Sequence, residues 1–166
     1  MEVVEPVRVD GRIVSSSRIR KLLAAGKIEA ARQMLIQPHR IRGRVVRGAA
    51  RGTKFGYPTA NIEPAGVLLP AEGIYAARAV ADGSQWPAAV SVGPNPTFGE
   101  TRQKVEAYLV GYQGSLYDQT IEVDFLARLR DIIKFDSVDA LVAQMARDVA
   151  LTRDIAARYD CEGASS

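Results

Sequence analysis

The sequence contains almost none of the residues that build disulfide frameworks or metal centres. Its 166 residues include one cysteine, Cys161, and one histidine, His39. A single cysteine excludes an internal disulfide or a thiolate metal site, and a lone histidine without a partner motif argues against zinc. No apolar run approaches the roughly 20 residues of a membrane span, and the N-terminus lacks the apolar region of a signal peptide. We therefore expect a cytoplasmic protein that does not enter a membrane.

Aromatic residues and unbalanced charge are also scarce. Aromatic side chains make up 7% of the chain, the net charge is +3, and no dense basic run occurs. A barrel that binds RNA needs aromatics interleaved with bases on one sheet face, and Tyr75, Tyr108 and Tyr112 are too sparse for that. Nucleic acid is therefore not an expected partner. The mild positive charge fits a small anionic ligand, and the length suits one domain with a full core.

A glycine-rich and basic stretch stands at 48–61, with the sequence GAARGTKFGYPTAN. Glycines allow positive φ angles and let backbone N–H groups turn towards one point. Such a concave row of donors suits phosphate oxygens, and Arg51 and Lys54 add positive charge beside it. The composition of this stretch therefore predicts a loop that cradles a phosphate group.

The end of the same stretch carries two neutral oxygen ligands. Pro58 fixes its own φ angle and favours an extended conformation at Tyr57. In an extended chain Thr59 and Asn61 share one face and Ala60 takes the other. A hydroxyl and an amide oxygen suffice for Mg²⁺ when a nucleotide brings the charged phosphate oxygens. The pattern fits a Mg²⁺–nucleotide clamp, but it also fits a mobile hairpin loop with local turn hydrogen bonds.

The first 38 residues predict two short helices. Any of the serines at 15–17 can cap a helix that ends at Gly26, and a second helix runs on until Pro38. Two short helices are too little to fold alone, so they must pack on the remainder of the chain. The serines, with Arg18 and Arg20, could bind phosphate, but we prefer the interpretation of an ordinary capped and solvated helix start.

From residue 40 onward the pattern becomes one of strands separated by glycine and proline. Consecutive short strands without intervening helices predict an antiparallel sheet closed as a barrel. A long helix follows, capped by Asp136 or Ser137, and its apolar stripe is expected to pack on the barrel. The predicted strands cover 40–47, 73–80, 86–92, 104–112 and 120–129, with an extended segment at 57–61.

One strand places a carboxylate where it can do chemistry. Glu106 lies on the face opposite Val105 and Ala107. If this face lines a cavity, Glu106 is a candidate general base for phosphoryl transfer to a hydroxyl group. If it faces water, Glu106 is a solvated residue paired with Lys104 or Arg102. Glu122 and Asp124 fit a solvent-exposed face better, so neither is a candidate.

Several separated motifs together resemble the riboflavin kinase family over roughly residues 38–155. The first is Gly43 followed by the 48–61 stretch. The others are LP at 69–70 with GIY at 73–75, VG at 92–93 with NPTF at 95–98, VE at 105–106, LY at 116–117, and LR at 129–130 with KF at 134–135. Their order and spacing match that family. The resemblance implies a mainly β fold, namely a closed six-stranded antiparallel, Greek-key-like barrel with a long C-terminal helix.

The resemblance also implies an activity: ATP- and Mg²⁺-dependent conversion of riboflavin to FMN. Thr59 and Asn61 would hold Mg²⁺ and the ATP phosphates, and Glu106 would deprotonate the 5′-hydroxyl of riboflavin. Two departures stand out, since Tyr108 occupies a position where many members have histidine, and Asp118 one where glycine is common. Further expected contacts are Gly48, Arg51, Gly52, Lys54 and Tyr57 with ATP, and Arg130 and Asp136 with the flavin ring.

The N-terminal segment resembles the end of the adenylyltransferase module that precedes this kinase in bacterial bifunctional FAD synthetases. The sequence VSSSRIR at 14–20 stands where that family has a Ser-Ser-Thr-x-Ile-Arg motif. We expect a helical remnant at 1–37, a kinase domain at 38–160, a flexible tail at 161–166 and an adenylyltransferase module upstream. FMN adenylylation is not expected of this fragment. The alternative to a kinase is a catalytically silent flavin- or nucleotide-binding barrel that regulates or docks.

Overall fold

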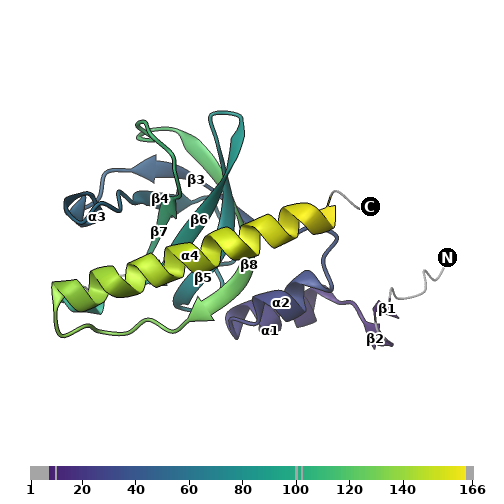
Figure 1. Ribbon diagram of the computed structural model, residues 1–166. Helices are drawn as coiled ribbons and strands as arrows, with labels where there is room; N and C mark the ends of the chain where they lie inside the picture. Colours follow the sequence, from purple (N-terminus) through teal and green to yellow (C-terminus); the bar gives the residue numbers. More distant parts are fainter. Residues whose placement is uncertain (1–7, 10, 100, 102, 164–166) are drawn as a thin grey trace.

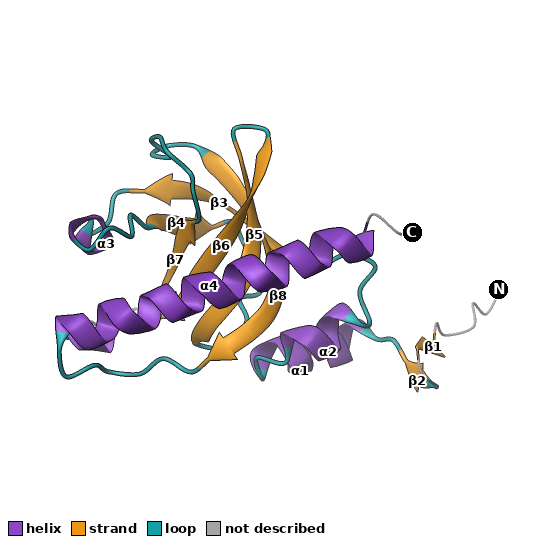
Figure 2. Cartoon of the chain, viewed as in Figure 1, coloured by secondary structure: helices purple, strands orange, loops and turns teal. Residues whose placement is uncertain are grey.

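A closed barrel of six antiparallel strands forms the body of the molecule (Figures 1 and 2). The computed structural model describes residues 8–9, 11–99, 101 and 103–163. The strand order is β3-β4-β7-β6-β5-β8, and pairing of β3 with β8 closes the barrel. β8 returns to lie beside β5 after the β5-β6-β7 meander, which is a Greek key. The predicted fold class is therefore confirmed, with strands β3 (His39–Val46), β4 (Ala60–Pro64), β5 (Gly73–Ala81), β6 (Ser84–Gly93), β7 (Lys104–Leu109) and β8 (Thr120–Arg130).

Alternation along the strands separates an apolar interior from the outer face. On β7, for example, Val105, Ala107 and Leu109 are buried while the residues between them are half-buried. Small and β-branched side chains supply most of the interior, together with the fully buried Tyr75 and Phe125. Gly43 has no room for a side chain, because a Cβ atom there would lie 2.4 Å from the Glu63 carbonyl oxygen. The interior is therefore tightly packed.

Helix α4 (Val138–Gly163) crosses the outside of the barrel and contacts β5, β6 and β8 (Figure 1). The Ser137 hydroxyl accepts a hydrogen bond from the Ala140 N–H at 3.1 Å, so Ser137 and not Asp136 caps the helix. Val149 and Ala156 on its inner face are buried. The helix ends at Gly163, so it includes the first three residues of the predicted tail. Residues 164–166 lie outside the described part of the chain.

Two short helices near the N-terminus, α1 (Ser16–Ala24) and α2 (Ile28–Arg32), pack beside the barrel. Ser15 caps α1, and Gly26, at a φ angle of +72°, follows its end as predicted. Leu23, Ile28 and Ala31 join the apolar core of the barrel, which explains how such short helices are stabilised. The second helix is shorter than expected, and a small hairpin that the sequence did not predict precedes them, with strands β1 (Arg8–Val9) and β2 (Arg12–Ile13).

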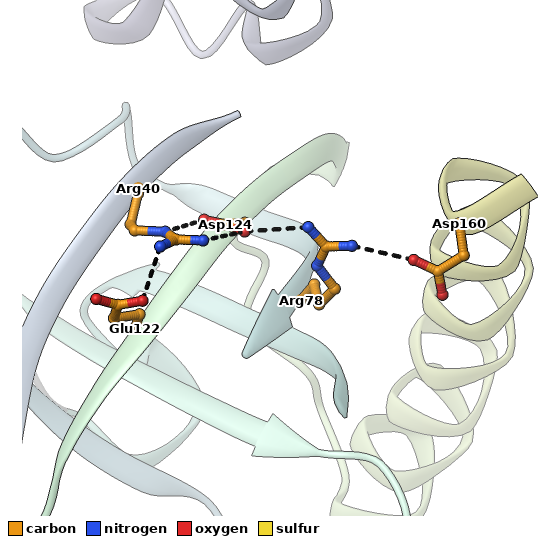
Figure 3. A network of polar contacts seen from close by, with 5 residues as sticks. All are labelled: Arg40, Arg78, Glu122, Asp124 and Asp160. Carbon is orange, nitrogen blue, oxygen red and sulfur yellow. Dashed lines mark hydrogen bonds and ion pairs between the residues drawn. The ribbon is translucent and has the colours of Figure 1, made fainter. Parts of the chain in front are cut away.

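One expectation about the outer face is wrong. Asp124 on β8 is only 1% exposed, although the strand pattern predicts a solvent-exposed face. Its carboxylate accepts hydrogen bonds from Arg40 on β3 and Arg78 on β5, and Arg78 also reaches Asp160 on α4 (Figure 3). The network covers this part of β8, and paired guanidinium groups let a carboxylate remain there. The alternation of polar and apolar residues along a strand does not show which side chains from other elements pack over it.

Two further short helices sit in loops. Helix α3 (Arg51–Lys54) interrupts the glycine-rich stretch, and the 3₁₀ helix η1 (Pro96–Phe98) lies between β6 and β7. Neither was predicted as a helix. Among the residues that the structure describes, no helix combines the length and hydrophobicity needed to cross a bilayer.

Candidate active site

A row of residues crosses the outer face of the barrel from β4 to β8. Asn61 pairs with Glu106, Glu106 with Ser91, Ser91 with Ile74, and Ile74 with Arg130. Residues directly opposite each other on neighbouring strands share a face, with Cβ atoms about 5 Å apart. The predicted amide ligand and the predicted base are therefore immediate neighbours. We call these five residues the cross-sheet row.

A cleft lies over most of the cross-sheet row. It is lined by four members of the row, namely Glu106, Ser91, Ile74 and Arg130. The segment around α3, the loop that contains η1, the segment after β8 and the first turns of α4 contribute most of the other lining residues. The remaining lining residues are Ala49, Arg51, Gly52, Phe55, Tyr57, Thr59, Ala89, Val90, Pro94, Asn95, Pro96, Thr97, Phe98, Tyr108, Ile132, Ile133, Phe135, Leu141, Met145, Asp148 and Val149.

At two glycines in the 48–61 stretch, atoms of the same stretch come so close to the backbone that a side chain would meet them. A Cβ atom on Gly48 would lie 2.0 Å from the Asn61 amide nitrogen, and one on Gly52 would lie 2.1 Å from the Tyr57 carbonyl oxygen. Ala50 adopts a left-handed conformation with a φ angle of 52°, which turns the chain into α3. The backbone of this loop is therefore folded tightly against the segment that carries Asn61.

Aromatic contacts join the glycine-rich stretch to the η1 loop and to β7. The Arg51 guanidinium lies over the Phe98 ring at 4.7 Å, and the Phe55 and Phe98 rings stack at 6.3 Å with 8° between their planes. Tyr57 meets Tyr108 edge to face at 5.3 Å. Such pairs each contribute on the order of 1 kcal/mol. Tyr108, one of the departures from the family pattern, thus packs against the glycine-rich stretch.

The opposite end of the cleft combines apolar residues with one ion pair. Arg130 donates to Asp148 of α4, with the shortest contact 2.7 Å from Nη2 to Oδ2. The Arg130 guanidinium also lies 5.7 Å from the centre of the Phe135 ring. The Phe135 N–H donates to the Thr97 hydroxyl at 3.3 Å, which ties the segment after β8 to the η1 loop.

Tyr75 and Arg128 are among the groups whose pKa is raised. Burial raises the pKa of Tyr75, whose hydroxyl donates to the Ala71 carbonyl oxygen. The hydrogen bond to Asp131 raises the pKa of Arg128 further above its ordinary value. Neither residue lines the cleft.

The predicted site residues fall into three groups. Arg51, Gly52, Tyr57, Thr59, Glu106 and Arg130 line the cleft. Gly48 and Asn61 lie against each other next to it, since Asn61 pairs with Glu106. Lys54 and Asp136 are exposed and do not line it. Arg102, the alternative partner for Glu106, lies outside the described residues.

Some cleft residues could not be found by the sequence analysis. Asp148 occupies a buried position on the apolar stripe of α4, and a polar residue in such a stripe is the one signal that points to it. Thr97 and Phe98 belong to a quoted motif but had no role assigned. Ser91 enters the site only through strand register, which the sequence does not give.

The described residues contain no cluster of three or more histidine, cysteine, aspartate or glutamate side chains that could hold a metal ion by themselves. The oxygen donors near the glycine-rich loop are the Thr59 hydroxyl, the Asn61 amide and the Glu106 carboxylate. A donor set of this kind fits Mg²⁺ only when phosphate oxygens and waters complete the coordination.

The protein is therefore a closed antiparallel barrel with a cleft on the outer face of its sheet, and residues of α4 form part of the cleft lining. Comparison with known proteins agrees with this class. The chain belongs to the riboflavin kinase family, because the family model "Flavokinase: Riboflavin kinase" matches residues 35–156. The predicted family is thereby confirmed.

The curated relatives are longer proteins. The bifunctional riboflavin kinase/FMN adenylyltransferase of Pseudomonas fluorescens is 35% identical over 158 residues, which cover 95% of this chain and 51% of that protein. The protein of the same name from Escherichia coli (strain K12) is 34% identical over 142 residues, covering 85% and 45%. The chain thus spans about half the length of the curated relatives that it matches.

Two solved structures are also similar. Riboflavin kinase from Trypanosoma brucei has a TM-score of 0.51 and 24% identity, covering 72% of this chain and 80% of that one, which shows the fold alone. A crystal structure named as a macrolide-efflux protein from Streptococcus pneumoniae has a TM-score of 0.81 and 38% identity, covering 90% and 50%. That name refers to a different activity, while the likeness is one of fold and sequence.

Proposed function

We propose that this chain transfers the γ-phosphoryl group of ATP to the 5′-hydroxyl of riboflavin, giving FMN and ADP. The observation that carries the proposal is the direct pairing of Asn61 with Glu106 on adjacent strands, beside a glycine-rich loop. Phosphoryl transfer depends on positioning and on charge stabilisation, with a base to accept the proton of the attacking hydroxyl. This corner of the cleft offers each of those functions within one residue pair and one loop.

Glu106 is the base in this proposal. Its carboxylate accepts the proton of the 5′-hydroxyl while the oxygen forms a bond to the γ-phosphorus, and the bond from that phosphorus to the bridging oxygen of ADP breaks. Glu106 lines the cleft and is half-buried, so a substrate hydroxyl can reach it. Base catalysis of this kind is worth about 10²–10⁴ in rate. The pairing of Glu106 with Lys104 or Arg102 remains the alternative.

Thr59 and Asn61 are the metal and phosphate ligands of the proposal. Mg²⁺, when bound with ATP, would neutralise the charge that develops on the phosphate oxygens. Gly48 holds the backbone against the Asn61 amide, and Gly52 does the same for the segment that leads to Thr59. We assign Gly48, Arg51, Gly52, Lys54 and Tyr57 to the phosphates and nucleotide. Lys54 is exposed, so in this proposal its positive charge would attract the phosphates of ATP as the nucleotide binds.

The flavin ring would occupy the apolar end of the cleft. Ile132, Phe135, Leu141 and Met145 provide surface for a planar ring, and Arg130 provides hydrogen-bond donors at its edge. Asp136 is exposed at the start of α4 and does not line the cleft. Its predicted flavin contact would therefore need a ligand that extends past the lining residues.

The test is an assay of FMN formation from riboflavin and ATP, with and without Mg²⁺. We expect FMN and ADP in equal amounts, with turnover that requires the metal. Riboflavin binding without any turnover would instead support the silent flavin-binding barrel. Absence of both binding and turnover would reject both hypotheses.

Two further expectations remain predictions. FMN adenylylation is named for the relatives, and we predict that this chain lacks it because the HxGH-type nucleotide motif is absent from its sequence. A separate module upstream would supply that activity. Detectable FAD synthesis by the chain alone would contradict this. A cytoplasmic location likewise stays a prediction, which cell fractionation would test.

A further inference from the structure

A buried aspartate on α4 faces the apolar end of the cleft. Asp148 is 4% exposed and lines the cleft together with Arg130. Its Oδ2 accepts from Arg130 Nη2 at 2.7 Å and from Nε at 3.1 Å, and its Oδ1 accepts from Gln144 Nε2 at 3.0 Å. The carboxylate thus fixes the guanidinium by a two-point contact, and Gln144 fixes the carboxylate in turn.

Arg130 keeps hydrogen-bonding capacity after this pairing. Its Nη1 donates to the Asp131 carbonyl oxygen at 3.0 Å, while Nε and Nη2 donate to Asp148. A guanidinium carries five N–H groups. Within the described part of the chain, two N–H groups of Arg130 therefore have no acceptor, and the side chain borders the cleft. A ligand with a carbonyl oxygen at its edge would supply one.

A second buried aspartate provides the contrast. Asp124 is 1% exposed and is held by the guanidinium groups of Arg40 and Arg78 (Figure 3). None of these three residues lines the cleft. Asp124 links β8 to β3 and β5, whereas Asp148 links α4 to β8, and only the partner of Asp148 lines the cleft.

The cross-sheet row sets the distance between Arg130 and the reacting end. Glu106 and Arg130 are separated by three strand spacings, through Ser91 and Ile74. At about 4.8 Å per spacing, this is roughly 14 Å along the sheet. A ligand with its reacting hydroxyl at Glu106 must therefore be elongated to reach Arg130. Flavins combine a five-carbon chain with a fused three-ring system whose edge carries carbonyl oxygens.

We propose that Asp148 is a positioning residue for the flavin ring: it holds the Arg130 guanidinium so that its two remaining N–H groups bind a carbonyl oxygen at the ring edge. This inference rests on the proposed function, because it assumes a flavin in the cleft. It adds a residue on α4 that makes no contact with the reacting atoms but sets affinity for the ring.

The test is the affinity of Asp148→Asn for riboflavin without ATP, measured by quenching of flavin fluorescence. The variant retains the shape of the side chain but loses the charge that fixes Arg130. We expect the Kd for riboflavin to rise about ten- to a hundredfold, with the same rise in its KM, while the KM for ATP stays within about twofold. An unchanged Kd for riboflavin would overturn the proposal.

Asp124→Asn is the matched control, because it removes an equally buried charge from an ion pair outside the cleft. We expect a comparable loss of Tm with an unchanged riboflavin Kd. If both variants weaken riboflavin binding to the same extent, the effect is one of general destabilisation and the proposal fails. Should Asp148→Asn not fold, Asp148→Glu keeps the charge, displaces the guanidinium, and is expected to weaken binding in the same direction.

Lumiflavin, which has the ring without the ribityl chain, locates the effect on the ligand. Asp148→Asn should weaken lumiflavin and riboflavin by the same factor, since the contact is with the ring. A loss for riboflavin alone would overturn the proposal. The binding measurement needs no turnover. Wild-type chain that binds riboflavin but makes no FMN defeats only the proposed function, whereas FMN formation with unchanged Asp148→Asn affinity defeats only this inference.

Discussion

The inside and the outside of the barrel wall follow different rules. Inside, Ala107 and Ile121 are almost fully buried and belong to the apolar core. Outside, the same strands carry the cross-sheet row, whose members differ in chemistry from one strand to the next. The interior therefore depends on size and shape alone, whereas the row depends on which polar group stands opposite which. Substitutions on the two faces should separate stability from activity.

The largest expected effect is on the outside. Glu106→Gln keeps the size of the side chain but removes the proton acceptor, so kcat for FMN formation should fall by about 10²–10⁴. The free energy of unfolding should change by less than about 1 kcal/mol, because the residue is half-buried on the outer face. Steady-state kinetics and urea unfolding measure the two quantities. Glu122→Gln, on the outer face of β8, is the control. Near-normal turnover in Glu106→Gln would reject Glu106 as the base.

The complementary change is inside. Ile121→Ala should lower the free energy of unfolding by about 2–5 kcal/mol, because the site is 1% exposed and leaves a cavity in a closed interior. The kcat of the folded fraction should stay within about twofold of wild type, since Ile121 does not line the cleft. Equilibrium unfolding in urea and kinetics at low temperature test this. A fall in kcat as large as that of Glu106→Gln would abolish the distinction between the faces.

A smaller effect is expected where the loop meets the row. In Gly48→Ala the new Cβ atom would lie 2.0 Å from the Asn61 amide, which must swing aside. The end of a side chain moves cheaply, so stability should fall by only about 1 kcal/mol, while the KM for Mg²⁺–ATP rises about tenfold. Adding Asn61→Ala should restore stability without restoring the KM. A double variant with wild-type KM would remove Asn61 from the ligand set.

The smallest effect concerns pH. Burial raises the pKa of Tyr75, so the unfolded chain releases this proton near pH 10 while the folded chain retains it. Stability from the protonated hydroxyl is therefore present below about pH 10 and is lost as the pH rises further. Tyr75→Phe should cost about 1 kcal/mol at neutral pH, and its difference from wild type should shrink at about pH 11. Urea unfolding at both pH values checks this, and a constant difference would contradict it.

The interior was the more predictable half of the molecule. Alternation of apolar residues gave five of the six strands, and Thr59 and Asn61 marked the sixth, because burial inside a barrel repeats every second residue. Capping by Ser15 and Ser137 and the break at Gly26 follow from local chemistry in the same way. These features depend only on residues that are close in the sequence.

The outer face was less predictable, because it depends on register and on what packs over it. No local pattern states that Asn61 stands opposite Glu106, or that Ser91 follows on the next strand. Asp124 is buried because Arg40 and Arg78 pair with it from neighbouring strands, and Asp148 is buried because α4 packs on the barrel and Arg130 pairs with it. Helix α3 is one turn stabilised by its loop, so the sequence around Arg51 does not predict it.

Central to this account is the idea that the side-chain amide on β4 and the carboxylate on β7 serve one phosphoryl transfer. A double-mutant cycle on kcat/KM for FMN formation, with Asn61→Ala and Glu106→Gln, tests it most directly. If the two groups act on the same transition state, the double variant should lose at least about threefold less than the product of the single losses. Losses that multiply without any such coupling would show that the two residues act independently, and would contradict the account.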